Sequence, residues 1–144
     1  MSAVTVEQVV DATGEVLAAC HRLLPQLSSS SPAITQAQLE EVLAAPLTVL
    51  FAARSNDEIV GLLTLVVFRI PTGLRAWIED VVVDEAARGR GVGEALNQAA
   101  LSEARRRGAK TVDLTSRPSR EAANRLYQRI GFKRRDTNVY RFEW

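Results

Sequence analysis

Apolar and polar positions alternate with two different periods along the first part of the chain, and each period predicts a different element. Residues 3–10 alternate in the manner of a strand. Residues 11–27 place apolar side chains at helical spacing, at Val16, Leu17, Cys20, Leu24 and Leu27. A serine run before Pro32 predicts a loop, and Thr35 with Gln38 forms a capping-box pattern that predicts the start of a second helix.

The centre of the chain predicts three strands. Residues 47–53 and 58–68 are apolar segments on either side of the turn sequence RSND, a pattern that predicts a hairpin. Residues 69–75 predict a loop. Residues 76–84 follow with three consecutive valines, which is typical of a strand that is buried on both faces.

The second half of the chain predicts helices that alternate with strands. After a glycine-rich segment, apolar spacing predicts a long helix that ends at Gly108, then a strand over 110–116 and a helix over 120–130. Residues 132–135 and 138–144 predict a last antiparallel pair. The strand-helix-strand order needs a parallel crossover beside antiparallel strands, so the pattern predicts a mixed α+β fold.

Composition favours one domain over residues 1–144. A chain of 144 residues with 47% hydrophobic content can bury one compact core. No apolar run approaches the ~18 residues of a transmembrane helix, and the amino terminus lacks the segments of a secretory signal. A lone Cys20 cannot form an internal disulfide, which fits a reducing compartment. We therefore expect a cytoplasmic protein that does not bind membranes.

Charge is distributed unevenly between the two parts of the chain. Residues 1–84 contain four arginines and ten acidic residues, whereas residues 85–144 contain fourteen basic and seven acidic residues. The basic part is expected to attract an anion, although solvated helix faces would produce the same imbalance. Few aromatic residues accompany the basic ones and no nucleic-acid-binding motif is present, so we expect no nucleic-acid partner.

The segment EDVVVDEAARGRGVGEAL joins the valine strand to the long helix through Gly89, Gly91 and Gly93. A strand that passes through a glycine turn into a helix presents free backbone N–H groups and the positive end of the helix dipole, which together bind anions. Arg88 and Arg90 add charges that can pair with phosphate oxygens. The alternative is that the glycines only form a tight turn.

The glycine spacing excludes two common phosphate sites. Glu94 follows Gly93, so the dinucleotide fingerprint G-x-G-x-x-G is absent, and the Gly-Lys-Ser/Thr of a P-loop occurs nowhere. The pattern Arg88-x-x-Gly91-x-Gly93 instead resembles the acyl-CoA-binding motif of the GNAT superfamily of N-acetyltransferases. The segment ANRLYQRIGF, over 123–132, is similar to the second signature of that family, in which a helix that carries a tyrosine ends in Gly-Phe.

The resemblance implies a fold and a cosubstrate. The sheet would be mixed and mostly antiparallel, with six to seven strands, four flanking helices, and fourth and fifth strands that are parallel and splayed. The cosubstrate would be acetyl-CoA, without a metal. Its pantothenate arm would lie along residues 81–83, and its pyrophosphate would lie on the glycine turn. The cofactor-binding residues that this implies are Val81, Val83, Arg88, Gly89, Arg90, Gly91, Val92, Gly93, Glu94 and Asn124.

The resemblance also implies two residues that handle protons. Tyr127 matches the tyrosine that gives a proton to the departing thiolate, and its place on an apolar helix face also predicts a packed ring. Glu79 matches the glutamate base of some members. The splayed strands would open a slot for the cofactor. Since neighbouring strand residues point to opposite faces, we expect only one of Glu79 and Asp80 to face this slot. A carboxylate here could equally pair with Arg75 or contact the substrate.

Two features depart from the family pattern. Arg120 stands where many members have an asparagine that holds the cofactor arm, and Asn124 lies one helical turn later. Arg117 and Arg120 either reach a CoA phosphate or stay solvated. His21 beside Cys20 lacks the partners of a catalytic triad, and one histidine with one cysteine makes no metal cluster, so we expect a packed cysteine and no metal.

The implied function is transfer of an acetyl group from acetyl-CoA to a primary amine by direct attack in a ternary complex. The acceptor would be a small-molecule amine or an amine of a protein or peptide. The acidic first part favours a cationic acceptor such as a polyamine or a lysine side chain. The alternatives are a non-catalytic acyl-CoA-binding or regulatory module and a nucleic-acid-binding domain. The apolar pattern VYRFEW permits a homodimer through the last strands.

Overall fold

The computed structural model describes residues 3–144, in which strands and helices alternate much as the apolar pattern predicts. In chain order the elements are β1 (Thr5–Val9), α1 (Gly14–Leu27), α2 (Gln36–Ala44), β2 (Thr48–Ser55), β3 (Glu58–Ile70), β4 (Gly73–Val83), the short 3₁₀ helix η1 (Glu85–Ala87), α3 (Val92–Arg106), β5 (Thr111–Asp113) and α4 (Glu121–Ile130). Within residues 3–144, no helix is long and apolar enough to cross a membrane.

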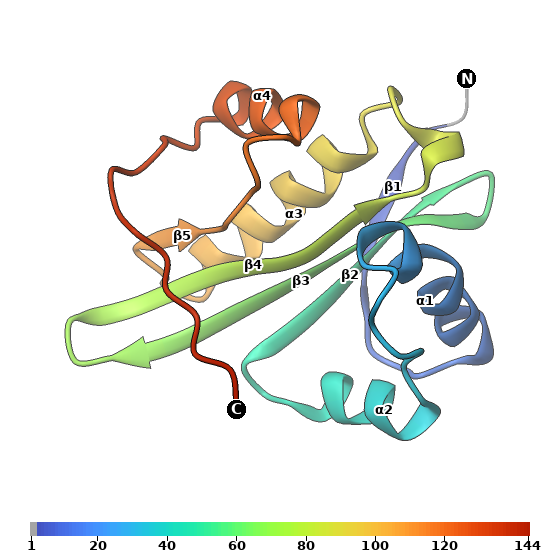
Figure 1. The fold of residues 1–144 in the computed structure, drawn as a ribbon. Helices are drawn as coiled ribbons and strands as arrows, with labels where there is room; N and C mark the ends of the chain where they lie inside the picture. Colours follow the sequence, from blue (N-terminus) through green and yellow to red (C-terminus); the bar gives the residue numbers. More distant parts are fainter. Residues whose placement is uncertain (1–2) are drawn as a thin grey trace.

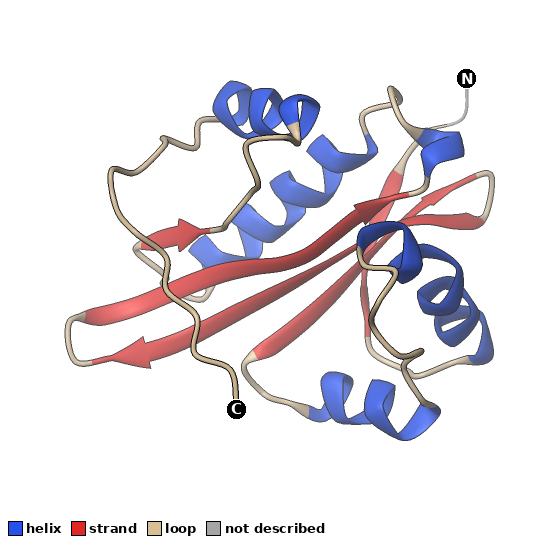
Figure 2. Ribbon diagram, in the orientation of Figure 1, coloured by secondary structure: helices blue, strands red, loops and turns tan. Residues whose placement is uncertain are grey.

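The strands form one mixed sheet in the order β1-β2-β3-β4-β5, labelled in Figure 1 and drawn in red in Figure 2. Neighbours from β1 to β4 are antiparallel, and β4 pairs with β5 in parallel. The mixed α+β class and the parallel fourth and fifth strands are therefore confirmed. The predicted loop over 69–75 is wrong, because β3 and β4 extend through most of it and leave only a tight turn around Pro71 and Thr72.

The predicted count of six to seven strands is also wrong: the sheet of the described residues has five. Residues 132–135 and 138–144 form no strand and continue as an irregular chain to the carboxyl terminus. The alternation of Tyr140, Phe142 and Trp144 fits a strand, but these side chains are at least 80% exposed. A strand pair becomes stable only when it packs on a further strand or helix, and no such packing buries this segment.

Helices cover both faces of the sheet (Figure 1). α1 and α2 bury their apolar side chains with one face of β2 and β3, and α3 packs on the other face. Val82 belongs to the core under α1, whereas Val81 and Val83 pack on the core under α3. The prediction that the valine strand is buried on both faces is thus confirmed, and β4 separates an α1 side from an α3 side.

Gly61 of β3 lets α3 approach the sheet closely. A Cβ added there would lie 2.9 Å from Val92 Cγ1 and 2.9 Å from Leu96 Cδ1. We expect Gly61→Val to lower the free energy of unfolding by about 1–3 kcal/mol, because overpacking displaces neighbours in a close-packed core. Urea unfolding measures the change. Gly14→Ala is the matched control, since no atom lies within 4 Å of its added Cβ; equal stability of both variants would contradict the close packing.

The last turn of α3 contains a carboxylate between two arginines. Arg106 Nε lies 2.9 Å from Glu103 Oε1, and Arg107 Nε lies 2.7 Å from Glu103 Oε2. Hydrogen bonds from Arg106 and Arg107 lower the pKa of Glu103 from 4.5 to about 2. The charged form is therefore favoured in the folded state, and its contribution to stability is lost as the pH falls through this range.

These two hydrogen-bonded ion pairs predict that the effect of Glu103→Gln on stability depends on pH. Because solvent screens surface ion pairs, we expect the variant to be less stable than wild type by only about 0.5–1 kcal/mol at neutral pH. The difference should shrink as the pH falls from 4.5 towards about 2, where the wild-type carboxyl also becomes neutral. Thermal unfolding of both proteins across this range measures it. A constant difference at every pH would show that charge is not its cause.

Candidate active site

The glycine turn before α3 is open and uncapped. Gly89 and Gly91 have φ values of 80° and 78°, a left-handed conformation that favours glycine. Gly91 is the residue before α3, and no side chain of the described residues caps this end of the helix. A Cβ added at Gly89 or Gly91 would meet no atom within 4 Å. The space beside the backbone of Gly89 and Gly91 is therefore open, as an anion site at the start of a helix requires.

Gly93 has a different role from the other two glycines. A Cβ at Gly93 would lie 3.1 Å from Leu126 Cδ2 of α4 and 3.8 Å from Val83 Cγ2. The missing side chain brings the start of α3, the end of β4 and the middle of α4 to one point. Since Tyr127 follows Leu126, this contact also positions the predicted proton donor near the glycine turn.

The edge of β4 is partly unpaired. Residues 75–77 pair with β5 at 111–113, and no pairing with β5 continues beyond them. The remainder of β4, up to Val83, thus offers backbone groups to which an extended chain could add as another strand. Ser116, just after β5, has a buried Oγ without a hydrogen-bonding partner among residues 3–144. Both features fit a cofactor with an amide-containing arm.

A β-bulge in β4 changes the direction of the two acidic side chains. Thr64 pairs with Glu79 and Leu62 with Val82, so that Asp80 and Val81 together oppose one residue of β3. Asp80 has a φ of 51°, which is uncommon for a residue with a side chain. The bulge interrupts the strict alternation on which the expectation of opposite faces rests. The residues on either side, Ile78 and Val81, both pack on the α3 side, so alternation places Glu79 on the α1 side with Asp80.

Tyr127 is a packed residue, as its place on an apolar helix face predicts, and its role as proton donor stays a prediction. Its ring is 7% exposed and makes an edge-to-face contact with Phe132, at a centroid distance of 5.8 Å. Burial raises the pKa of Tyr127 above its usual value, and the charge of Arg120 lowers that pKa by less. The hydroxyl therefore keeps its proton at neutral pH. Within residues 3–144 no group forms a hydrogen bond with this hydroxyl, so the proton is available to a ligand.

The other predicted cofactor residues differ in what they could offer a ligand. Arg88 and Arg90 are exposed on the turn, where their charges can reach an anion. Asn124 uses its Nδ2 within the protein, donating to the carbonyl oxygens of Arg117 and Arg120 at 2.9 and 2.8 Å. The amide thus holds the segment before α4, and only its side-chain oxygen remains for a ligand. The side chain of Val92 is buried, so this residue can contribute only its backbone.

Asn97, which the sequence pattern did not single out, is fully buried on α3. Its Nδ2 donates to the carbonyl oxygen of Gly93 at 2.8 Å, while its Oδ1 has no partner among the described residues. The amide supports the first turn of α3 next to the glycine turn. The signal in the sequence was an asparagine directly after Leu96 on a helix face that is otherwise apolar.

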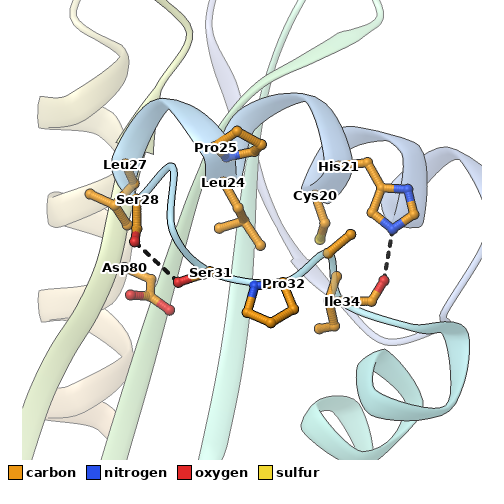
Figure 3. A pocket seen from close by; sticks show the side chains of 11 residues that line it. Cys20, His21, Leu24, Pro25, Leu27, Ser28, Ser31, Pro32, Ile34 and Asp80 are labelled. Atoms are coloured by element: carbon orange, nitrogen blue, oxygen red, sulfur yellow. Dashed lines mark hydrogen bonds between the residues drawn. The ribbon is translucent and has the colours of Figure 1, made fainter.

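A cavity lies on the α1 side of β4 (Figure 3). Its volume is about 190 Å³, and its walls are the second half of α1, residues 31–34 and Asp80. Cys20 lies in one wall, where burial raises the pKa of its thiol and keeps it unreactive at neutral pH. His21 Nε2 lies 2.7 Å from the carbonyl oxygen of Ile34. Histidine and cysteine thus shape the cavity, and no group of metal-ligating side chains occurs within residues 3–144.

Comparisons with known proteins agree with this arrangement. The chain is 35% identical over 86 residues to N-alpha-acetyltransferase 30 of Schizosaccharomyces pombe, a match that covers 58% of this chain and 57% of the relative. The chain thus matches little more than half the length of that protein. A solved structure from Bacillus halodurans, described as a transcriptional regulator, superposes with a TM-score of 0.83 at 25% identity, covering 99% of this chain and all of the other.

A second structure shares the fold at lower identity. An aminoglycoside acetyltransferase from an uncultured soil metagenomic sample superposes with a TM-score of 0.85 at 19% identity, covering 98% of this chain and 95% of the other. The family model of the Acetyltransferase (GNAT) family matches residues 15–132, which include the glycine turn, the bulged strand and the tyrosine helix. The chain is therefore a member of the GNAT family of acetyltransferases.

Proposed function

We propose that this protein transfers an acetyl group from acetyl-CoA to a primary amine by direct attack in a ternary complex. The observation that carries the proposal is the contact at Gly93, where the start of α3, the end of β4 and the middle of α4 come together. Three features on these elements support it. These are the open left-handed turn at Gly89 and Gly91, the unpaired edge of the strand, and the unpartnered hydroxyl of Tyr127. An anion, an extended arm and a leaving thiolate each require one of them.

Acetyl-CoA supplies an activated thioester, and the residues around the turn would hold it. The N–H groups from Arg88 to Glu94 would receive the pyrophosphate, with the guanidinium groups of Arg88 and Arg90 adding charge. The backbone of residues 81–83 would hydrogen-bond to the pantothenate arm. The backbone N–H of Val83 would then polarise the thioester carbonyl and stabilise the oxyanion.

The acceptor would approach from the α1 side, where both carboxylates of β4 lie. Glu79 takes a proton from the ammonium group, and the freed lone pair attacks the carbonyl carbon of the thioester. The tetrahedral intermediate collapses as its C–S bond breaks. Tyr127 gives its proton to the departing sulfur, which leaves CoA as a thiol. The protonated nitrogen of the new amide then returns a proton through solvent to the Tyr127 phenolate, which yields the neutral amide, and Glu79 releases its proton to solvent.

Initial rates of thiol release with acetyl-CoA and a set of primary amines test the proposal. Double-reciprocal plots should intersect when both substrates are varied, because direct attack needs both in one complex. Parallel plots would indicate an acetylated enzyme and contradict direct attack. Acetyl-CoA binding with no thiol release for any amine would favour the non-catalytic module instead.

A further inference from the structure

The cavity between α1 and β4 is mostly apolar. Carbon-rich side chains supply most of its lining, namely Leu24, Pro25, Leu27, Pro32, Ala33 and Ile34. Its volume of about 190 Å³ exceeds that of a ~150 Å³ apolar protein cavity that binds benzene. An isobutyl or phenyl group therefore fits. The lining contains a carboxylate at one point only, and it contains no lysine or arginine.

That point is Asp80, which supplies the only carboxylate of the lining. No lysine or arginine lines the cavity to neutralise it. The bulge and the left-handed backbone of Asp80 turn this side chain towards the α1 side. The next residue, Val81, packs on the α3 side, where the glycine turn lies. The Asp80 carboxylate thus lies in the wall of the apolar cavity, on the strand whose edge is proposed for the cofactor.

Two hydrogen bonds hold the outer wall of the cavity in place (Figure 3). The ring of His21 is bound to the carbonyl of Ile34 at 2.7 Å, and the hydroxyls of Ser28 and Ser31 lie 3.1 Å apart. A wall that is fixed before a ligand arrives reduces the entropy lost on binding.

Three other acidic residues of the first part of the chain pair with arginines and do not line this cavity. Arg54 pairs with both Glu7 and Glu15, at 2.6 Å from each. Hydrogen bonds from Arg54 lower the pKa of Glu15. Glu58 lies 4.0 Å from Arg22. Part of the negative charge that suggested a polyamine acceptor is thus neutralised by internal ion pairs. The second ammonium group of a polyamine would meet the apolar walls of the cavity.

We propose that the acceptor is a primary amine that carries an apolar group of about the size of an isobutyl or phenyl group. The apolar group lies in the cavity, and Asp80 binds the ammonium end and directs it towards the edge of β4. This inference rests on the proposed function for the reaction itself. It deepens that function by naming the class of acceptor.

Amino-acid amides provide matched probes, because they share the amine and the amide and differ only in side chain. We expect kcat/KM for leucinamide and phenylalaninamide to exceed that for glycinamide by about ten- to hundredfold, as burial of such a side chain predicts. Spermidine should be no better than glycinamide. A higher kcat/KM for glycinamide or spermidine than for leucinamide would overturn the inference.

Replacing one of two alanines with phenylalanine tests whether the cavity causes the preference for leucinamide. Ala33 lines the cavity, whereas Ala37 is exposed on α2 and does not. We expect Ala33→Phe to remove most of the preference for leucinamide over glycinamide, and Ala37→Phe to retain it. An unchanged preference in Ala33→Phe would show that the apolar group binds elsewhere.

Titration of the protein with each amide measures acceptor binding independently of acetyl transfer. Leucinamide and glycinamide are each titrated into the wild-type protein saturated with CoA, without turnover. We expect leucinamide to bind about tenfold or more tightly than glycinamide, and Asp80→Asn to weaken leucinamide binding by about tenfold. Preferential binding without any acetylation would contradict the proposed function alone. Equal binding of the two amides, or none, would overturn the proposed acceptor.

Discussion

Replacing Tyr127 with phenylalanine is expected to lower kcat by about 10²- to 10⁴-fold, the range usual for loss of a positioned general acid. The change removes the hydroxyl and keeps the ring that packs on Phe132. Since the aromatic contact remains, we expect the free energy of unfolding and the KM for acetyl-CoA to change little. Initial rates at saturating acetyl-CoA and amine measure the effect.

Tyr140→Phe is the matched control for this prediction. Tyr140 is 88% exposed on the carboxyl-terminal segment and lies outside the site, so the same loss of one hydroxyl should leave kcat unchanged. Because burial raises the pKa of Tyr127 above that of a free tyrosine, deprotonation of this residue should lower the wild-type rate only at strongly alkaline pH. A Tyr127→Phe variant with wild-type kcat would contradict the donor role.

Replacing Gly91 with asparagine is expected to weaken acetyl-CoA binding by about 10- to 100-fold or more. Asparagine tolerates the left-handed backbone better than most residues, so the turn can keep its φ of 78°. Its side chain, however, would occupy the space that lies open beside the turn. The rise in Tm that acetyl-CoA causes measures the effect, because a ligand stabilises the folded state according to its affinity.

Gly108→Asn provides the control at the opposite end of α3. Gly108 has a φ of 89° and lies just beyond the last turn of the helix, far along the chain from the glycine turn. A Cβ there would make an ordinary contact of 3.4 Å with Leu74. We expect this variant to show the full Tm rise with acetyl-CoA. A full rise in Gly91→Asn as well would place the cofactor away from the turn.

Much of the fold and one part of the site follow from local patterns. Helical spacing predicts α3 and α4, and the succession of a buried strand, a glycine turn and a helix predicts an anion site before any coordinates are known. Gly89 and Gly91 support this prediction, since both have the positive φ that glycine alone adopts at little cost. Here the chemistry depends on backbone conformation, which neighbouring residues largely determine.

The features that the sequence did not reveal depend on contacts between distant segments. The bulge at Asp80 adds one residue to β4 without altering the apolar pattern around it, so the shared direction of Glu79 and Asp80 was hidden. Gly61 signals close approach within a strand, but not that α3 is the partner. The cavity is made by a helix, a loop and a bulge, each with its own local pattern, and its apolar character appears only when they meet.

The difference between local pattern and contacts across the fold also explains why the sequence predicts too many strands. Residues 138–144 satisfy the alternation of a strand, but a strand also needs a partner for its backbone. β5 pairs with β4 over three residues, and the carboxyl-terminal segment does not extend that pairing. Local pattern predicts which segments can form strands, whereas pairing decides which of them do.

Calorimetric titration of the wild-type protein with acetyl-CoA tests the central claim most directly. The account predicts binding of one acetyl-CoA per chain, with an affinity that weakens at high salt because the pyrophosphate is held partly by Arg88 and Arg90. Absence of binding would contradict both the proposed reaction and a non-catalytic role in binding acyl-CoA. The open glycine turn before α3 would then be a structural turn only.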